Sequence, residues 1–294
     1  MAGVTKVANI DVHVREVDFV SRFSKNWDAL RQIMGIMRPI KKAPGTQLVS
    51  YTASVTLEDG DVDEAAQIPF SVANVTEAYK SDVDIKKYAK AVSIEAVNKY
   101  GAKIAIEKTD DEFLNQLQIS VLTQFYTFLN TGSLTGSAAT WQKALAKAKG
   151  DVLDKFNKMR KTVTDVVAFV NVNDLYAYLG EASITVQSAF GLQYIKDFMG
   201  YKTMFLLSEP DITEGTVIAV PVENIDLYYV DPGDSDFAQL GLDYTVDGET
   251  NLIGFHAEGN YGKAIGESYA LMGMKLWAEY LDGIAVVSVN ANPS

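Results

Sequence analysis

The most regular pattern of hydrophobic and polar positions in this chain lies in residues 49–57, where apolar side chains alternate strictly with serine and threonine. Such alternation is typical of a β-strand with one apolar face. The next residues, 58–64, are mostly acidic and contain an Asp-Gly step, which favours a turn. Apolar side chains alternate again at Ile68, Phe70 and Val72. The pattern predicts a long β-hairpin with an acidic tip.

A second pattern, with helical spacing, covers residues 109–129. Thr109, with Glu112 three positions later, matches a capping box, and Asp110 and Asp111 place negative charge at the positive end of the helix dipole. Apolar residues then follow at helical spacing: Phe113, Leu114, Leu117, Val121, Leu122, Phe125, Phe128 and Leu129. A helix of about 20 residues is about 30 Å long, and its wide apolar stripe needs an extended surface to lie against.

The segment before the hairpin is less regular. Residues 1–43 show one short helical pattern of apolar residues, from Phe19 to Met34. We therefore expect an extended arm that contains a short amphipathic helix.

The second half of the chain alternates predicted helices and strands. A linker rich in Ser, Thr, Gly and Ala at 131–140 precedes a helix with a basic face at 141–161. A buried strand at 166–170 precedes a short helix that Asn173 or Asp174 is expected to cap. Further strands are predicted at 203–207, 216–220, 225–230 and within 252–289, ending in a core strand at 283–289. This alternation indicates a compact α/β or α+β domain.

Charge is unevenly distributed along the 294 residues, whose net charge is −12. Residues 1–42 carry eight basic and four acidic residues, a net charge of +4, whereas residues 203–294 carry two lysines and fifteen acids, a net charge of −13. A solvated acidic surface with a basic tail accounts for this asymmetry. A two-faced shell with nucleic acid on one side would produce the same asymmetry.

The composition argues against most catalytic and metal sites. The chain is 48% hydrophobic with a mean hydropathy of +0.01, which is typical of a well-packed soluble protein. The absence of Cys removes disulfides, thiolate nucleophiles and Cys-containing metal sites. His13 and His256 lie outside any nucleophile or metal-ligand motif. No apolar run reaches signal-peptide or membrane-spanning length. We expect no catalytic residue, no cofactor and no metal site.

Two loops only partly match ligand-binding motifs. Residues 259–264 lack the full glycine spacing of a phosphate loop, and Ala264 stands where Ser or Thr would hold magnesium. Residues 59–70 begin like a calcium loop, but Glu64 occupies the glycine position and Phe70 the position of the bidentate glutamate.

Several stretches, taken with the order of the elements, match one family. Residues 92–97 (VSIEAV) precede the long helix and residues 127–132 (TFLNTG) end it. Residues 169–175 (FVNVNDL) join a strand to a helix cap, and Gly200 begins a strand pair that continues through residues 215–219 (GTVIA). These features resemble the major capsid proteins of tailed bacteriophages, which have the HK97-like fold.

The resemblance implies an α+β chain with the HK97-like capsid fold. The implied parts are an N-terminal arm (1–43), an E-loop β-hairpin (44–80), a P-domain with a long spine helix (81–132), a mixed α/β A-domain (133–250) and C-terminal strands that return to the P-domain (251–294).

The resemblance implies a structural protein and not an enzyme. Members of the family self-assemble into hexamers and pentamers that form an icosahedral shell around double-stranded DNA. The implied location is the virion capsid, and the host cytoplasm during assembly. The implied partners are other copies of the chain, a portal and, in some members, a decoration protein. Because the chain has no room for a scaffolding domain ahead of the arm, the resemblance implies that scaffolding comes from a separate protein or has already been removed. Contact with packaged DNA is expected to be nonspecific, and no membrane is implied.

The lysine-to-asparagine crosslink known in part of the family is not expected, because residues 45–70 contain no lysine. Two alternatives stay open. An encapsulin-like nanocompartment shell would have the same fold and enclose a protein cargo. A hydrolase with a hairpin arm is the other, but the sequence lacks a nucleophile and base motif.

We expect the hairpin to contact a neighbouring subunit, because a lone two-stranded hairpin is marginal in water. The candidate contact residues are Val49, Tyr51, Val55, Glu58, Asp59, Asp61, Asp63 and Glu64. The candidate basic partners of the acidic tip are Arg38, Lys41, Lys42 and Lys86. For the tip residues taken singly, a solvated turn is an equally good interpretation. The residues expected to face DNA are Lys143, Lys147, Lys149, Lys155, Lys158, Arg160 and Lys161.

Overall fold

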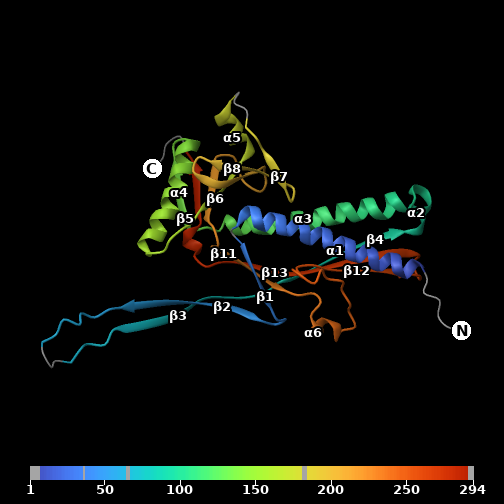
Figure 1. Cartoon of the computed structure of the whole chain (residues 1–294), viewed down its shortest axis with the longest axis horizontal. Coiled ribbons are helices and arrows are strands. Elements are labelled where there is room, and N and C mark those ends of the chain that lie inside the picture. Colours follow the sequence, from blue (N-terminus) through green and yellow to red (C-terminus); the bar gives the residue numbers. More distant parts are fainter. Residues whose placement is uncertain (1–6, 36, 64–66, 181–183, 291–294) are drawn as a thin grey trace.

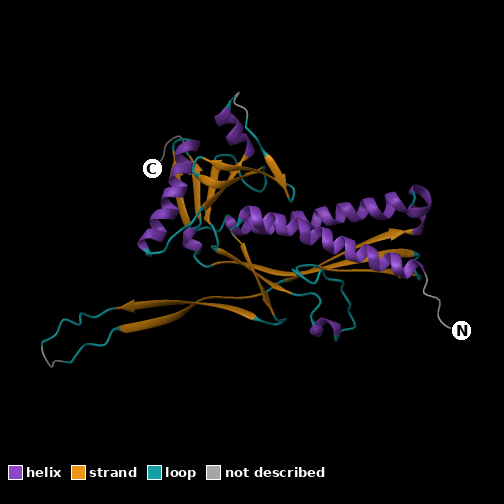
Figure 2. Cartoon of the chain, viewed as in Figure 1, coloured by secondary structure: helices purple, strands orange, loops and turns teal. Residues whose placement is uncertain are grey.

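The computed structural model describes residues 7–35, 37–63, 67–180 and 184–290. An elongated part carries two long helices over a sheet, a second part is a mixed α/β body, and a hairpin projects away from both (Figure 1, Figure 2). The mixture of helices and strands confirms the predicted α+β class.

The elongated part is built on β13 (Ile265–Ala278). The first half of β13 pairs with β4 (Ile85–Ser93) along one edge and with β12 (Gly254–Asn260) along the other. Its second half pairs with β11 (Ile225–Val230), which in turn pairs in parallel with β1 (Met37–Lys42). The 14-residue β13 thus gives the extended surface that a long helix requires.

Two long helices lie side by side over this sheet, α1 (Val7–Met34) and α3 (Lys108–Leu129) (Figure 1). The short helix α2 (Ile94–Tyr100) and the π-helical turn η1 (Lys103–Glu107) lead into α3. Phe19 of α1 stacks on Phe255 of β12 with ring centroids 4.1 Å apart and lies 6.0 Å from Phe113 of α3. All three elements therefore share one hydrophobic core.

The α/β body is a seven-stranded sheet with helices α4 (Trp141–Lys158) and α5 (Val172–Leu179). Its strands, in spatial order, are β5 (Leu134–Ala138), β14 (Ala285–Val289), β10 (Thr216–Pro221), β6 (Val166–Asn171), β9 (Tyr201–Leu207), β8 (Leu192–Phe198) and β7 (Gln187–Ala189). Two short helical turns, α6 (Ser235–Ala238) and η2 (Leu281–Gly283), lie in the connections.

The central strand β6 is buried along its whole length because its two faces serve two cores. Val167 and Phe169 belong to the core shared with α1 and α3, whereas Ala168 and Val170 belong to the core under α4. Successive side chains of a strand point to opposite faces, so this continuous apolar run fixes both layers at once. The predicted strand at 166–170 is confirmed.

The predicted hairpin is present as β2 (Gln47–Thr56) and β3 (Val72–Asp82), which form a two-stranded sheet of their own. Thr56 and Val72 are its last paired residues, and the register shifts between Ser50 and Tyr51. The return strand begins at Val72. Ile68 and Phe70 therefore lie in the loop, whereas the alternation predicted that they belong to the strand. The loop at the end of the hairpin is therefore longer than the acidic turn alone.

The prediction of an extended arm with a short helix is wrong. Helix α1 has 28 residues, and Phe23, Trp27 and Leu30 are buried with Phe19 in the main core. The strand β1 then follows. The residues in the first half of α1 show little helical periodicity in the sequence. Their contacts with β12 and α3 hold them in the helix.

Two predicted helix caps are also corrected. Thr109 does not cap α3, because η1 already precedes it; its hydroxyl donates to the carbonyl oxygens of Ala105 and Ile106. Helix α5 is capped by Asn171, whose side chain accepts from the Asn173 amide at 2.9 Å. Both helices occur where the apolar spacing places them, but the polar residues near their starts have other partners.

The predicted boundary at residue 250 does not separate the two sheets. Strands β12 and β13 belong to the elongated part, but β14 lies between β10 and β5 in the α/β body. Strand β11, before the boundary, belongs to the elongated sheet. Each part is therefore assembled from segments that are distant in the sequence.

Candidate functional site: intersubunit surfaces

The hairpin leaves the body at a buried root and is exposed beyond it. Leu48 is buried, whereas Val49 and Val55 are exposed, Val55 by 58%. Tyr51 lies on β2 next to the register shift, and its side chain is outside the described part. An apolar strand face that no other part of the subunit buries is typical of a surface that binds another chain.

The loop beyond the strands combines apolar and acidic side chains. Leu57, Ile68 and Phe70 are exposed by 81%, 64% and 83%. The acids Glu58, Asp59, Asp61 and Asp63 are all exposed, and within the described residues they take part in no ion pair. Glu64 lies outside the described residues. We call residues 57–63 and 67–71 the hairpin tip.

Two of the four predicted basic partners are already bonded within the subunit. Arg38 donates to Asp226 at 2.8 Å and to Glu279 at 3.2 Å. Lys41 lies 2.5 Å from the buried Asp231, and this hydrogen bond raises the pKa of Lys41. Sequence reasoning could not foresee these pairs, because their members are about 190 or more residues apart.

The other two predicted partners carry charge that no acid of the described chain neutralises. The ammonium group of Lys42 lies 5.0 Å from the ring centre of Tyr228, and Lys86 is exposed on β4. Neither forms an ion pair among the described residues.

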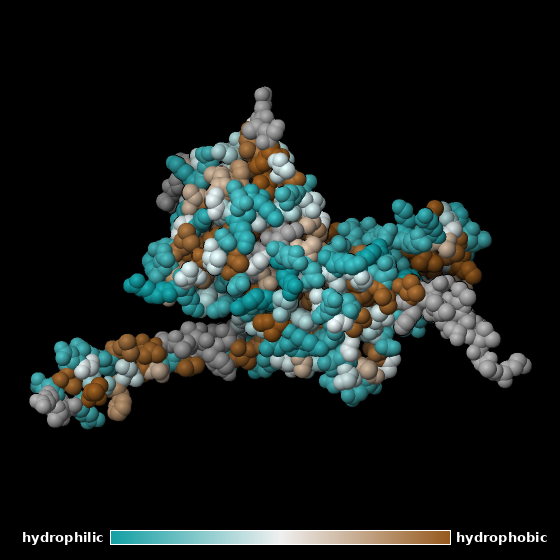
Figure 3. Space-filling model, in the orientation of Figure 1, coloured by the Kyte–Doolittle hydropathy of each residue, from teal (hydrophilic) through white to brown (hydrophobic). Residues whose placement is uncertain are grey.

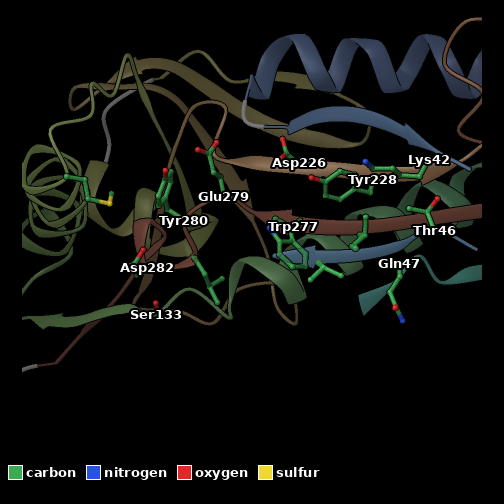
Figure 4. Close-up of a pocket in the computed structure, with 14 residues that line it drawn as sticks. Lys42, Thr46, Gln47, Ser133, Asp226, Tyr228, Trp277, Glu279, Tyr280 and Asp282 are labelled. Atoms are coloured by element: carbon green, nitrogen blue, oxygen red, sulfur yellow. The ribbon is translucent and has the colours of Figure 1, made fainter. Parts of the chain in front are cut away.

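A groove of about 1090 Å³ lies at the root of the hairpin, and no sequence pattern predicted it. Figure 4 shows its wall, with Tyr228 and Trp277 in the middle and Glu279, Tyr280 and Asp282 at one end. Its carboxylates are bonded within the subunit: Asp226 and Glu279 to Arg38, and Asp282 to Lys155. The groove therefore presents aromatic surface and paired carboxylates, together with the ammonium group of Lys42, which forms no ion pair among the described residues.

The basic segment predicted to face DNA lies on α4 and just after it. Acids within the subunit bind four of its lysines: Lys147 pairs with Asp151 at 3.0 Å, Lys158 with Asp154 at 2.6 Å, Lys155 with Asp282, and Lys161 with Glu279 at 3.7 Å. Lys149 donates to the carbonyl oxygen of Gly200. Lys143 and Arg160 are exposed and take part in no ion pair among the described residues. The free positive charge of this segment is therefore smaller than its sequence indicates.

The N-terminal helix is fastened by two buried acids. Asp110 on α3 accepts from Arg15 of α1 and lies 2.5 Å from Lys90 of β4. Burial alone would raise the pKa of Asp110, but hydrogen bonds from Arg15 and Lys90 outweigh it and lower the pKa. Glu16 of α1 accepts from the amide of Ala257 and from the hydroxyl of Thr245, both at 2.6 Å. Asp110 lies in the first turn of α3, as predicted, and it also forms a buried ion pair that the sequence did not predict.

The end of the molecule opposite the hairpin tip has a second exposed apolar surface. A groove of about 430 Å³ lies there between α2 and the turn that joins β12 to β13. Ile94, on one side, is 59% exposed, and Tyr261, in the turn, is fully exposed. Figure 3 shows hydrophobic residues gathered both at this end and on the hairpin.

Within the described residues, no group of three or more His, Asp or Glu side chains is placed to hold a metal ion. None of the described helices is both long enough and apolar enough to cross a membrane. His256 lies 3.7 Å from Glu16 and 3.9 Å from Glu258, and the side chain of His13 is outside the described part.

Comparison of sequences finds no matching family model and no matching curated protein. Comparison of structures gives matches along nearly the whole chain. A chain of the virus-like particle from Pyrococcus furiosus is 14% identical with a TM-score of 0.51, over 92% of this chain and 98% of that chain. A chain from Mycobacterium phage Patience is 10% identical with a TM-score of 0.56, over 98% and 91%.

A third match comes from the mature capsid of bacteriophage PhiM1, with 6% identity and a TM-score of 0.56, over 89% of this chain and 87% of that chain. The chain has the HK97-like capsid fold. The fold predicted from the order of elements is therefore confirmed. In the terms of this capsid fold, β2 and β3 are the E-loop and α3 is the spine helix.

Proposed function

We propose that this chain is the major capsid protein of a tailed bacteriophage. It self-assembles into hexamers and pentamers that form an icosahedral shell around double-stranded DNA. The observation that carries the proposal is the E-loop: a two-stranded sheet of its own, anchored at Leu48 and exposed at Val55, Leu57 and Phe70. Such a hairpin is marginal by itself, so a second copy is expected to bury it.

The energetics support this assignment of the hairpin. Burying one large apolar side chain contributes about 2 kcal/mol, and Leu57, Ile68 and Phe70 are all available for burial. An icosahedral shell repeats the same contact many times, so each subunit gains this stabilisation on assembly. Val49 and Val55 extend the contact along the strand.

We propose that the chain is divided into an N-terminal segment, an E-loop, a P-domain and an A-domain. The E-loop contacts a neighbour, and the sheet around β13 with α3 forms the P-domain. The α/β body, with β14 added, forms the A-domain. A portal and a separate scaffolding protein complete the assembly, which takes place in the host cytoplasm, and a decoration protein is a further candidate partner.

We also propose that the basic segment on α4 is oriented toward the interior. Lys143 and Arg160 are the strongest candidates for contact with DNA, because the described acids leave their charge free. Such contact would read only phosphate charge and would weaken as salt rises.

The contents of the particle test the proposed function. The chain is expressed with its neighbouring genes, and the particles are sized and imaged by electron cryomicroscopy. Icosahedral shells with a portal at one vertex and packaged DNA are expected. Closed shells that hold a protein cargo and no portal would establish a nanocompartment instead, and a monomer that never assembles would contradict both.

A further inference from the structure

The chain contains three Asp-Gly steps, at residues 59–60, 247–248 and 282–283. In such a step the backbone nitrogen of the glycine can attack the side-chain carboxyl carbon of the aspartate and close a five-membered imide ring. Glycine favours the attack because no Cβ hinders the approach of the two groups. The attack also requires an amide group that is not held in a hydrogen bond and an aspartate side chain that can turn toward it. The fold therefore decides which of the three steps can react.

The reaction is an isomerisation that needs only water. The glycine nitrogen loses its proton to the solvent and bonds to Cγ of the aspartate, while one carboxyl oxygen leaves as water. Water then adds to either carbonyl group of the imide. One ring opening restores the aspartate, and the other leaves the chain linked through the side chain, as isoaspartate. The mass and the charge are unchanged, but the backbone gains a methylene group.

The step at Asp247 and Gly248 is locked. The amide of Gly248 donates to the side-chain oxygen of Asn251 at 2.8 Å. The carboxylate of Asp247 accepts from the backbone amides of Thr250 and Asn251 at 3.2 and 2.6 Å. Burial alone would raise the pKa of Asp247, but its hydrogen bonds outweigh burial and lower the pKa. Both reacting groups are therefore engaged, and the loop must open before the ring can close.

The step at Asp282 and Gly283 is also locked. It lies in the turn η2, where the amide of Gly283 donates to the carbonyl oxygen of Tyr280 at 3.0 Å. The carboxylate of Asp282 pairs with Lys155. Gly283 is buried, and a Cβ placed on it would lie 2.6 Å from the ring of Phe156. The packing leaves no room for the backbone to rearrange.

The step at Asp59 and Gly60 is open. Residues 57–63 form neither helix nor strand, and both members of the step are exposed. Among the described residues the amide of Gly60 donates no hydrogen bond. Oδ1 of Asp59 accepts from the amide of Asp61 at 3.0 Å, which folds the carboxyl group back toward the peptide that it must attack. This step combines an available amide with a carboxyl group that is already turned toward it.

We propose that Asp59–Gly60 is a site of spontaneous isoaspartate formation in the unassembled subunit, whereas the other two Asp-Gly steps are protected by the fold. The site lies in the hairpin tip, so the product has a longer loop with one carboxylate displaced. Under the proposed function, assembly holds the tip against a neighbouring subunit and suppresses the reaction, because a held loop opens less often. This protection rests on the proposed function, but the site itself does not.

Peptide mapping of incubated subunits tests the site. Unassembled subunits are kept at neutral pH and physiological temperature, and isoaspartate is located by mass spectrometry with electron-transfer fragmentation. We expect at least about tenfold more product at Asp59 than at Asp247 or Asp282, because a locked step must first open at a cost of more than about 1.4 kcal/mol. The same chain unfolded in urea is the reference, and there the three steps should react at similar rates. Equal amounts at the three steps of the folded subunit would overturn the proposed site.

Gly60→Ala is the matched variant. It keeps every charge of the tip, and its Cβ has room, since the nearest atom is Cγ2 of Ile68 at 3.8 Å. The added methyl group crowds the attacking nitrogen, so the product at Asp59 should be lost while the circular dichroism spectrum stays that of the parent. Undiminished product in Gly60→Ala would also overturn the site.

Particles of the unaltered chain test the protection by assembly. Product at Asp59 should accumulate at least about tenfold more slowly in particles than in unassembled subunits. Equal rates would show that assembly does not hold this part of the tip. If the chain forms no particles, the proposed function fails, whereas the site is decided by the unassembled subunit alone, so the two failures are distinguishable.

Discussion

Arg15 on α1 and Asp110 on α3 form a two-point ion pair, with Nε and Nη2 of Arg15 at 2.5 and 2.8 Å from the two carboxylate oxygens. The same guanidinium group donates to the hydroxyl of Ser268 on β13 at 2.7 Å, and Lys90 of β4 reaches the same carboxylate. Four elements are joined at one buried acid. A buried ion pair gives little net stability compared with an apolar pair of the same shape, but it costs much to break. It therefore fixes where α1 lies.

Replacing the buried acid should destabilise the subunit. Asp110→Asn leaves Arg15 and Lys90 without their anion, and we expect the free energy of unfolding to fall by about 3 kcal/mol. Urea denaturation of the unassembled subunit measures it. Asp111→Asn is the matched control, since its pair with Arg22 is exposed and should contribute less than about 1 kcal/mol. Equal effects of the two changes would show that the buried pair does not hold α1.

The same carboxyl predicts a dependence on pH. Its hydrogen bonds hold the pKa of Asp110 below the ordinary 3.8. The stabilisation is therefore present above pH 3.8 and is lost as the pH falls through the lower pKa of the folded state. The difference in unfolding free energy between the parent and Asp110→Asn should stay constant near neutral pH and shrink below pH 3.8. Asp211→Asn is a control of opposite sign, because burial raises the pKa of Asp211. A difference that grows in acid would contradict the assignment.

Two glycines should respond to alanine with opposite signs. A Cβ at Gly132, after α3, would lie 2.6 Å from Cγ2 and 2.7 Å from the carbonyl oxygen of Ile284. The backbone at Ile284 cannot move freely because it leads into β14, so Gly132→Ala should cost about 1–3 kcal/mol. Gly150 lies within α4 with nothing within 4 Å, and Gly150→Ala should stabilise by up to about 1 kcal/mol. Thermal unfolding of the two variants measures both signs. A neutral Gly132→Ala would mean that the chain passes Ile284 at a greater distance.

The sequence correctly predicted the elements in which one face carries regularly spaced apolar side chains. The alternation at 49–57 corresponds to β2, and the apolar spacing after Thr109 corresponds to α3. Helix α1 was missed in its first half because Val12, Val14 and Val17 are poor helix formers. What holds that half in place is Arg15 and Glu16, whose partners are 95 and more residues away.

The candidate site divides in the same way. The exposed acids of the tip could be predicted from their crowding in a turn, whereas the alternation placed Leu57, Ile68 and Phe70 in the strands. The groove between α2 and the β12–β13 turn could not be predicted, because these segments become neighbours only when β13 pairs with β4. The acidic partners of Arg38 and Lys41 could not be predicted either, because β1 lies beside β11 only in the folded chain.

The apolar part of the tip can be tested separately from its charge. Phe70→Ser removes an 83% exposed ring, so the unfolding free energy of the subunit should change by less than about 0.5 kcal/mol. The particle yield should fall, since the ring would otherwise be buried on assembly. Leu240→Ser, at a 73% exposed position after α6, is the control and should assemble normally. Sedimentation of both proteins measures the yield. Normal assembly of Phe70→Ser would exclude the ring from the contact.

The reach of the hairpin can be removed without touching the core. Thr56 and Val72 are the last paired residues of β2 and β3, so replacing residues 57–71 with Asn-Gly joins them through a two-residue turn that suits the hairpin twist. The buried root at Leu48 and the cores around Phe19 and Phe169 are unaffected. Circular dichroism should therefore show a native-like spectrum with cooperative melting.

The same shortened protein should not complete shells, because the excised loop contains the exposed apolar residues and the carboxylates of the tip. Sedimentation at the size of a monomer or a small oligomer is expected where the parent gives large particles. A second variant replaces residues 57–71 with a Gly/Ser loop of the original length, which keeps the length of the hairpin and removes its acidic and apolar side chains. This variant should fold equally well and also fail to assemble. Full-size shells from the Asn-Gly variant would refute the intersubunit role of the hairpin tip. Shells from the Gly/Ser variant alone would show that length suffices and that the acidic and apolar side chains make no specific contact.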